Sequence, residues 1–360
     1  MSKILIFSLA YFPVEGGAEI AVKQITDRLP DIEFDLVTKR FDKSHMSFER
    51  VGNVNVYRID SSKLFFPIKA CRFAHKLERD RRYDTAWSIM AAFAGLAGLF
   101  FKLRHPSVKF ALTLQEGDSL EYIKKRMGIL RPLFRQIFIK ADIVTAISNF
   151  LADWGRDMGA REVIVIPNGV DTEKFKVQSS KLKVDDNTIL ITTSRLIEKN
   201  AVGDIIESLK YLPENVSLKI LGIGPLESAL KLQTVNCKLQ TRVQFLGHVD
   251  YSEIPSYLHN ADIFIRPSLS EGFGNSFIEA MASGLPVIAT PVGGIPDFLR
   301  HEVTGLFCEP RNPESIAMQV KRLISDETLR TRLVDNASRM VDDRYGWDLV
   351  AREMSRKVFN

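Results

Sequence analysis

Two glutamates, Glu271 and Glu279, stand eight residues apart around a glycine-rich loop in the string SLSEGFGNSFIEAMASGLPVIATPVGGIPD (268–297). A carboxylate accepts two hydrogen bonds from neighbouring hydroxyls, so Glu271 could bind a sugar and Glu279 a ribose diol. The backbone amides between them could bind hydroxyls or a diphosphate, because a helix begins there and its N-terminus favours negative charge. These exposed amides would belong to Gly272, Phe273, Gly274 and Asn275.

A second interpretation of Glu279 is structural. Ser276 and Glu279 fit the S-x-x-E capping box, in which the glutamate would only close the start of the helix. The complete string makes chance an improbable source of the pattern. A basic segment, SRLIEKN (194–200), fits the same chemistry. Its Arg195 and Lys199 can converge on a phosphate from a loop at the carboxyl edge of a sheet.

Two further glycine-rich segments are weaker signals. In EGGAE (15–19), Gly16 and Gly17 let backbone N–H groups approach an anion where a helix begins, although a tight strand-to-helix turn needs glycine in any case. The segment lacks the G-x-G-x-x-G pattern, and no Walker lysine follows it. LGIGPL (221–226) could border a nucleotide, but turn chemistry is the favoured interpretation, because Pro225 can occupy the first position of the next helix.

The elements that must position these residues follow from the hydrophobic pattern. Short apolar runs alternate with helical patterns in both halves of the chain, which is typical of parallel sheets covered on both faces. This indicates an α/β fold of two Rossmann-like, doubly wound domains that face each other across a cleft, the default ligand site. IPNGVDTEKF (166–175) and the polar stretch to Asn187 predict the linker. The predicted domains are 1–168, with a C-terminal crossover helix at about 343–360, and 169–342.

The string at 268–297 resembles the signature of the family 4 glycosyltransferases, which have the two-domain GT-B fold. Glu271 and Glu279 match the two glutamates of the family's E-x7-E motif. The other matching segments occur in the family's order and cover nearly the whole chain: EGGAE (15–19), PNGVD (167–171), SRLIEKN (194–200), FLGHV (245–249) and DRYGWDLVAREM (343–354).

The resemblance implies a retaining transfer of a sugar from a nucleotide diphosphate-sugar donor, with no metal or other cofactor required. It gives catalytic roles to Arg195 and Lys199, which would neutralise the leaving diphosphate, and to Glu271, which would hold the sugar. Fixed cations stabilise the charge that develops on the leaving phosphates more than they stabilise the ground state. The implied donor-binding residues are Gly16, Gly17, Val249 (beside the base), Gly272, Phe273, Gly274, Asn275 and Glu279 (on the ribose).

The sequence departs from the family pattern in two places. Many relatives carry a histidine where this chain has Gln115, in TLQEGDS (113–119). A glutamine cannot take a proton as an imidazole can, although it can hydrogen-bond the donor sugar. Glu116 or Asp118 could then bind or deprotonate the acceptor, and in the family's usual mechanism the departing phosphate itself receives the proton. Asn200 stands where relatives often have glycine.

Charge and composition limit the classes of partner that the protein is expected to bind. Residues 1–170 hold 26 Lys+Arg and 19 Asp+Glu, a net +7, whereas residues 171–360 hold 23 and 25, a net −2. The basic excess gathers in Lys69–Arg82 and Lys124–Lys140, where apolar residues lie between the charges. A solvated helix face is one interpretation, and attraction to an anionic membrane surface is the other. No nucleic-acid-binding motif accompanies the charge, so nucleic acid is not expected as a partner.

The number of cysteines and the lack of long apolar runs limit the cellular compartment in which the protein is expected. Three cysteines, far apart and odd in number, suit a reducing cytoplasm and offer no zinc module. The run Ala86–Phe101 is shorter than a membrane-spanning helix needs and indicates a buried strand and helix. The expected location is the cytoplasm, with peripheral association at the inner face of the cell membrane. The expected acceptor is a glycan or a lipid-linked intermediate of cell-surface polysaccharide biosynthesis.

Alternative functions remain on the same fold. A nucleotide-sugar epimerase or hydrolase would need an acid/base pair that acts without an acceptor. A non-catalytic nucleotide-sugar-binding protein is kept open by Gln115. An NAD-dependent oxidoreductase should carry G-x-G-x-x-G after its first strand, which EGGAE does not supply. The sequence identifies neither the base, the sugar, the acceptor, the linkage nor the oligomeric state.

Overall fold

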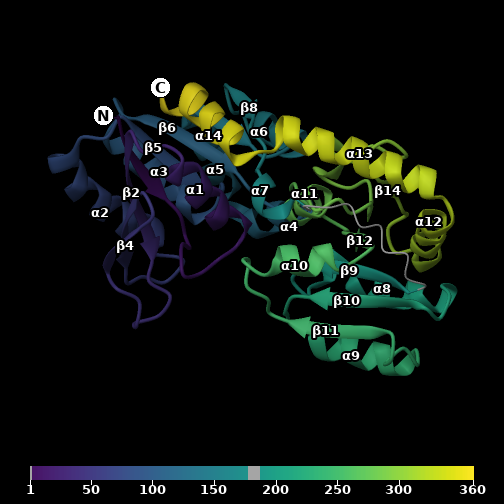
Figure 1. Ribbon diagram of the computed structural model, residues 1–360. Helices are drawn as coiled ribbons and strands as arrows, with labels where there is room; N and C mark the ends of the chain where they lie inside the picture. Colours follow the sequence, from purple (N-terminus) through teal and green to yellow (C-terminus); the bar gives the residue numbers. More distant parts are fainter. Residues whose placement is uncertain (1, 177–186) are drawn as a thin grey trace. The chain divides into compact units, whose positions relative to one another are not determined.

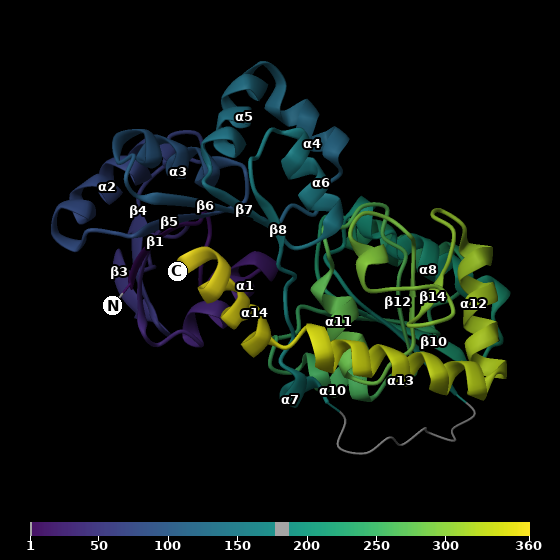
Figure 2. The ribbon, with the colours of Figure 1, turned by 90° about the horizontal axis from the view of Figure 1, so that it is seen from above.

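The computed structural model describes residues 2–176 and 187–360, and these form two compact units. The first unit holds Met1–Asn168 together with Trp347–Asn360, and the second holds Gly169–Gly346. Each unit contains a twisted sheet with helices packed on it (Figures 1 and 2). The α/β fold with two parallel-sheet domains is thereby confirmed. Of the linker expected between 166 and 187, residues 177–186 lie outside the described part of the chain.

The first unit is built on a sheet of order β3-β4-β2-β1-β5-β6-β7-β8, in which the β3–β4 pair is antiparallel and the other described pairs are parallel. Its elements are β1 (Ser2–Phe7), α1 (Gly17–Asp27), β2 (Ile32–Lys39), β3 (Phe48–Val51), β4 (Val54–Ile59), α2 (Phe66–Arg81), β5 (Thr85–Ile89), α3 (Phe93–Arg104), β6 (Lys109–Leu114), α4 (Leu120–Met127), the 3₁₀ turn Gly128–Leu130, α5 (Arg131–Lys140), β7 (Ile143–Ala146), α6 (Asn149–Asp157), β8 (Val163–Val165) and α14 (Trp347–Met354), which continues as a π turn, Ser355–Phe359.

Alternation along β1 explains why helices cover both faces of this sheet. Ile4 and Ile6 point into a core shared with α1 and α14, and Leu5 and Phe7 point into a core shared with α2 and α3. Successive side chains of a strand point to opposite faces, so a continuous apolar run requires cover on both sides. The C-terminal helix α14 therefore belongs to the core of the first unit, and Trp347 is fully buried there.

The second unit has a sheet of order β11-β10-β9-β12-β13-β14, with parallel pairs throughout its described strands. Its elements are α7 (Thr172–Phe175), β9 (Thr188–Thr193), the 3₁₀ turn Glu198–Asn200, α8 (Val202–Ser208), the 3₁₀ turn Leu209–Tyr211, β10 (Val216–Leu221), α9 (Glu227–Asn236), β11 (Val243–Gly247), α10 (Ile254–His259), β12 (Ile263–Arg266), α11 (Asn275–Ala282), β13 (Val287–Ala289), the 3₁₀ turn Ile295–Asp297, β14 (Leu306–Phe307), α12 (Pro313–Ser325) and α13 (Glu327–Arg344).

Two short strands, β3 and β14, lack the apolar runs from which the sequence predicts the two sheets. β3 alternates exposed and half-buried residues because it forms the antiparallel edge of the first sheet, so it carries no continuous apolar run. β14 has two residues, too few for a periodic signal. The predicted run Ala86–Phe101 is a buried strand and helix, β5 and α3. No helix within the described residues has the length and apolar character to cross a membrane.

Candidate active site

Three of the predicted site residues of the second unit follow strands of one parallel sheet. Arg195 follows β9, Val249 follows β11 and Glu271 follows β12. The carboxyl ends of parallel strands meet at one edge of a sheet, where ligands bind in doubly wound folds. Arg195 is exposed there, and Lys199 and Val249 are half-buried.

The loop with Arg195 packs backbone to backbone on the LGIGPL segment. A Cβ at Gly222 would lie 1.9 Å from the carbonyl oxygen of Ser194, and one at Gly224 would lie 2.3 Å from that of Leu196. Gly222 also has a φ of +132°, a backbone conformation that favours glycine. This close approach gives both glycines a structural reason, in agreement with the turn interpretation, and it fixes the course of the loop that carries Arg195.

Arg266, at the end of β12, joins three predicted segments of the site. Its Nη2 donates to Oε2 of Glu271 (2.5 Å) and to Oδ1 of Asn200 (3.1 Å), and its Nη1 donates to Oγ of Ser276 (2.8 Å). The guanidinium also lies 5.4 Å from the centroid of the Phe277 ring. The planar fork of arginine allows this combination, and both partners of the Arg266–Glu271 ion pair are about nine-tenths buried.

Asn200, which stands where relatives often have glycine, has a structural role. Its side chain is buried; the Nδ2 donates to the carbonyl oxygen of Arg195 (2.6 Å), while Oδ1 accepts from Arg266. The neighbouring Lys199 accepts through its own carbonyl oxygen from the amide of Leu269 (2.6 Å). The segment with both predicted cations is thus tied to the loop that precedes Glu271.

The Gly-Phe-Gly loop differs from the prediction in two respects. Gly272 and Phe273 are buried rather than exposed, and the Gly272 amide donates to Oε1 of Glu271 (3.0 Å). The capping box is also wrong: the N-cap of α11 is Gly274, and Ser276 is the second helical residue, bonded to Arg266. Gly274 has a φ of +89°, so the turn into α11 depends on glycine and needs no side-chain cap. Asn275 is the first residue of α11.

Glu279 lies within α11 and is 9% exposed. Burial raises its pKa to about 7, while a hydrogen bond from the Tyr251 hydroxyl and the charges of Arg266 and Lys174 act in the opposite direction. Its carboxylate is therefore a buried acceptor with one hydroxyl donor and two cations near it.

In the first unit, Gly16 is the N-cap of α1 and Gly17 its first residue. Glu19 folds back onto this turn, since its Oε2 would lie 2.7 Å from a Cβ placed at Gly16. Burial raises the pKa of Glu19, and a hydrogen bond from its own amide lowers it in part. The chain's own carboxylate thus lies where the sequence predicts an approaching anion.

The three predicted acceptor-side residues follow β6. The side-chain amide of Gln115 makes reciprocal hydrogen bonds with Asn168: Nε2 of Gln115 donates to Oδ1 (3.1 Å), and Nδ2 of Asn168 donates to Oε1 (3.0 Å). Glu116 accepts from the amides of Ala91 (2.6 Å) and Gln115 (2.9 Å), and burial raises its pKa to about 7. Asp118 is half-buried in the same loop. Gln115 and Glu116 therefore hold neighbouring loops in place.

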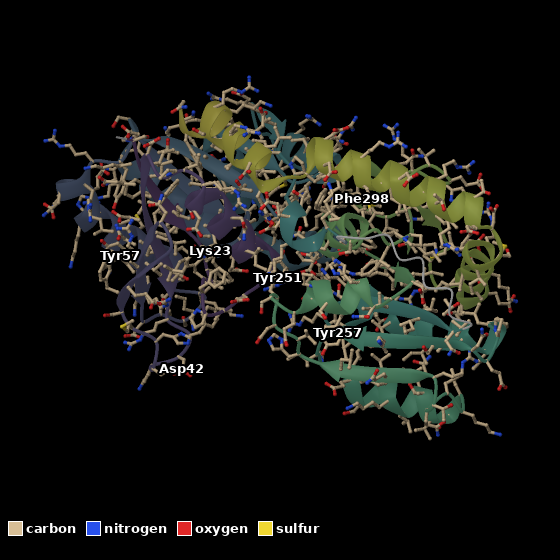
Figure 3. All side chains as sticks on the ribbon, viewed as in Figure 1. Lys23, Asp42, Tyr57, Tyr251, Tyr257 and Phe298 are labelled. Atoms are coloured by element: carbon tan, nitrogen blue, oxygen red, sulfur yellow. The ribbon has the colours of Figure 1, made fainter. Side chains whose placement is uncertain are left out.

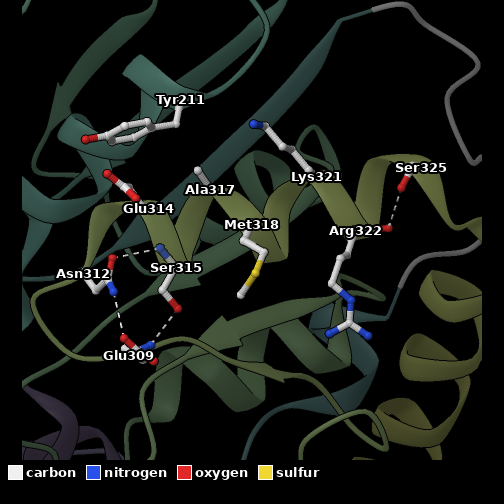
Figure 4. A pocket seen from close by; sticks show the side chains of 10 residues that line it. All are labelled: Tyr211, Glu309, Asn312, Glu314, Ser315, Ala317, Met318, Lys321, Arg322 and Ser325. Atoms are coloured by element: carbon white, nitrogen blue, oxygen red, sulfur yellow. Dashed lines mark hydrogen bonds between the residues drawn. The ribbon is translucent and has the colours of Figure 1, made fainter.

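A separate hollow of about 610 Å³ runs along the exposed side of α12 (Figure 4). Its walls include Tyr211, Glu314, Met318 and Lys321, and no predicted site residue lines it. The Tyr211 hydroxyl hydrogen-bonds Glu314, which raises the pKa of the phenol. Within residues 2–176 and 187–360, no three His, Cys, Asp or Glu side chains are grouped so that they could hold a metal ion.

Sequence reasoning missed Arg266, Tyr251 and Lys174. Arg266 had one signal, because a charged residue ends an otherwise apolar strand beside the Gly-rich loop. Tyr251 and Lys174 carried none, since only the hydrogen bond from Tyr251 and the nearby charge of Lys174 relate them to Glu279.

Two family models cover most of the chain. The model described as Glycosyltransferase Family 4 matches residues 15–174, and the model described as Glycosyl transferases group 1 matches residues 173–340. The chain therefore belongs to the family 4 glycosyltransferases, and it is a glycosyltransferase enzyme.

Relatives and solved structures agree with this assignment. An uncharacterized glycosyltransferase of Methanocaldococcus jannaschii is 28% identical, covering 98% of this chain and 96% of the relative. The GDP-mannose-dependent alpha-(1-6)-phosphatidylinositol monomannoside mannosyltransferase of Mycobacterium tuberculosis is 24% identical over 99% and 97%. Sucrose-phosphate synthase from Thermosynechococcus elongatus has a TM-score of 0.86 at 20% identity, over 99% of this chain and 98% of that chain. Anabaena HepE in complex with UDP and glucose has a TM-score of 0.83 at 21% identity, over 99% of both chains. These structural likenesses show the GT-B fold.

Proposed function

We propose that this enzyme transfers a sugar, with retention of anomeric configuration, from a nucleotide diphosphate-sugar to a glycan or lipid-linked acceptor. The observation that carries the proposal is Arg266. Its guanidinium holds Glu271, Asn200 and Ser276 together and so links the loop of the predicted cations, the Gly-Phe-Gly loop and the start of α11. HepE, a relative in fold, has been crystallised with UDP and glucose, which supports a nucleotide-sugar donor.

The proposed roles follow from the charge that develops during the reaction. As the glycosidic C–O bond breaks, negative charge grows on the departing diphosphate, and Arg195 and Lys199 stabilise it. Glu271 and its loop hold the sugar, Glu279 accepts from the ribose hydroxyls, and Val249 lies beside the base. Because two side chains supply the positive charge, we expect the reaction to need no metal. Turnover that is unchanged in excess EDTA is the expected result, and turnover that requires added Mg²⁺ or Mn²⁺ would contradict it.

Proton transfer is assigned to the departing phosphate. Gln115 and Glu116, in the loop after β6, are both engaged in hydrogen bonds, Gln115 with Asn168 after β8 and Glu116 with Ala91 after β5. A glutamine accepts no proton at neutral pH. The acceptor hydroxyl therefore loses its proton to the leaving group on the same face of the sugar, which is consistent with retention. NMR of the product linkage tests this, and an inverted anomeric centre would contradict it.

The donor is identified by thermal stability. Ligands that bind the folded state raise the melting temperature by mass action. We expect one member of a panel of UDP, GDP, ADP and their sugars to raise it in a concentration-dependent manner. If none of the panel stabilises the protein, the proposed donor class is wrong.

The acceptor is assigned to a lipid-linked or surface-glycan intermediate, at the inner face of a membrane. The names of two relatives support this class: the phosphatidylinositol monomannoside mannosyltransferase and the capsular polysaccharide biosynthesis glycosyltransferase CapM of Staphylococcus aureus. The further support is the surface formed by residues 120–140, which we call the α4–α5 surface.

The α4–α5 surface combines positive charge with exposed apolar side chains. It carries six Lys or Arg and one Glu. Ile129, in the turn between the two helices, is 95% exposed, and Tyr122 and Leu130 are about half exposed. Figure 2 shows α4 and α5 beside each other in the first unit. Apolar side chains enter the headgroup boundary while cations attract anionic lipids.

Sedimentation with vesicles of anionic and of zwitterionic phospholipid tests this surface. We expect salt-sensitive binding to the anionic vesicles. Replacing Lys124, Lys125 and Arg126 with glutamine should weaken binding on the order of 100-fold, at about 1 kcal/mol per cation. Ile129→Ser should weaken it further, whereas the control Leu232→Ser, which removes another exposed aliphatic side chain, should not. Equal binding by the triple variant would remove the basis of the membrane proposal.

A further inference from the structure

Glu279 is approached by groups from three segments of the second unit. Tyr251 comes from the loop after β11, Arg266 from β12 and Lys174 from α7. The Tyr251 hydroxyl donates a hydrogen bond to the Glu279 carboxylate, and Arg266 and Lys174 are the two cations that act on it. Figure 3 labels Tyr251 near the start of α10, the helix that carries Tyr257.

Tyr251 is held firmly in this place. The Nζ of Lys174 donates to the carbonyl oxygen of Tyr251 (3.3 Å) and lies 4.6 Å from the centroid of its ring. The Phe175 ring packs against the same phenol with centroids 5.8 Å apart. Lys174 and Phe175 are themselves fixed, because Asp171 caps α7 through the amide of Lys174 (3.1 Å) and His259 bonds the carbonyl oxygen of Phe175 (2.8 Å).

The hydrogen bond leaves Glu279 with acceptor capacity. A carboxylate offers about four lone-pair sites, and Tyr251 uses one of them. Burial, together with the Glu279 charge and the hydrogen bond to it, raises the pKa of the phenol, so Tyr251 remains a donor at neutral pH. A donor fixed on one side orients the two oxygens of the carboxylate, and with them the remaining lone pairs.

We propose that Tyr251 is a positioning residue for the donor nucleotide: its hydroxyl orients the Glu279 carboxylate so that the remaining lone pairs accept both hydroxyls of a ribose. This inference rests on the proposed function, because it assumes that Glu279 binds the ribose. The ionised carboxylate accepts from hydroxyls more strongly than the protonated carboxyl does, so protonation of Glu279 weakens binding. Loss of the phenol hydroxyl removes a donor that favours the ionised form and therefore moves the protonation of Glu279 to higher pH.

Calorimetric titration with UDP, GDP and ADP between pH 5.5 and 8.5 tests the inference, with inorganic pyrophosphate as a ligand that lacks ribose. For the wild-type protein, we expect affinity for the preferred nucleotide to rise as the pH increases through about 7, the pKa of Glu279. Tyr251→Phe should weaken that nucleotide about tenfold at neutral pH, the size expected for a hydrogen bond to a charged group, and should move the pH midpoint upward. Its effect on turnover should appear in KM rather than in kcat.

Two variants and pyrophosphate separate positioning from packing. Glu279→Gln should abolish the pH dependence, and Tyr257→Phe, a half-buried tyrosine on α10, should change neither affinity nor pH profile. Pyrophosphate affinity should be the same in Tyr251→Phe as in the wild type. If Tyr251→Phe has the nucleotide affinity and the pH profile of the wild type, the inference about Tyr251 is wrong, while the proposed function still stands. An equal loss of pyrophosphate binding would also contradict the inference, because it would report general damage. A wild-type protein that binds no nucleoside diphosphate would overturn the proposed function together with the inference.

Discussion

Helices α1 and α11 both begin at a glycine N-cap without a capping side chain, but different charges lie over their first turns. At α1 the carboxylate of Glu19 folds back onto the turn. At α11 no acidic residue is present in the first turn, and the guanidinium of Arg266 binds Ser276 there. Because a helix N-terminus carries partial positive charge, the Glu19 carboxylate opposes an incoming anion at α1, whereas at α11 the nearby Glu271 carboxylate is already paired with Arg266. Two similar glycine loops thus differ in how well their surroundings favour an anion.

The largest expected effect comes from Arg195 and Lys199, whose segment is linked to α11 through Asn200 and Arg266. Arg195→Ala combined with Lys199→Ala should lower kcat about 10⁴-fold, because removing one stabilising contact from a transition state costs roughly 10²- to 10³-fold. Steady-state kinetics with the identified donor measures this. The control, Lys231→Ala with Lys238→Ala, removes two exposed lysines of the same unit and should leave kcat unchanged. Near-normal turnover of the first variant would place the phosphate site elsewhere.

The next largest effect is expected from a change of Arg266, the residue that binds the first turn of α11. Arg266→Met leaves the buried Glu271 without its partner, which should cost about 3–5 kcal/mol of unfolding free energy. Denaturant unfolding measures the loss. Adding Glu271→Gln should restore much of the stability, because the unpaired charge is gone, but it should not restore turnover. Recovery of turnover in the double variant would show that the ion pair is only structural.

A matched glycine pair tests the two helix starts directly. Gly274→Ala places a Cβ at a φ of +89° and 2.5 Å from the Phe277 ring, and should cost at least about 1–3 kcal/mol. Gly16→Ala should cost much less, because Gly16 is extended (φ −157°) and its Cβ would meet only the flexible end of Glu19. Thermal unfolding of both variants measures the difference, and equal losses would contradict it.

The smallest effect should come from Glu19. If α1 approaches the donor phosphate, as the family resemblance implies, Glu19→Gln removes a resident negative charge from that helix start. The charge–helix interaction is about 0.3–1 kcal/mol, so the donor KM should fall about two- to fivefold. A higher KM would instead mean that Glu19 supports the loop in the form that binds.

Much of the fold was accessible from the sequence because parallel strands buried on both faces form continuous apolar runs. β5 and β7 are such runs, since each of their residues is buried. The candidate site was accessible where chemistry and turn geometry share a short string, as around Glu271. The capping box failed because a local pattern, Ser276 with Glu279, competes with a glycine turn that starts α11 two residues earlier.

The sequence by itself determined the family and the two parallel-sheet arrays, and it predicts which residues bind a nucleotide-sugar, because each of these is expressed in local pattern or composition. Only the tertiary structure decided which side chains act on one another. Arg266 joins residues from three loops, Tyr251 bonds Glu279 from 28 positions earlier in the chain, and Gln115 is engaged by Asn168. Such contacts depend on which strand ends lie beside each other at a sheet edge. Burial then shifts the pKa values of the side chains that make these contacts, and no local sequence pattern shows this effect.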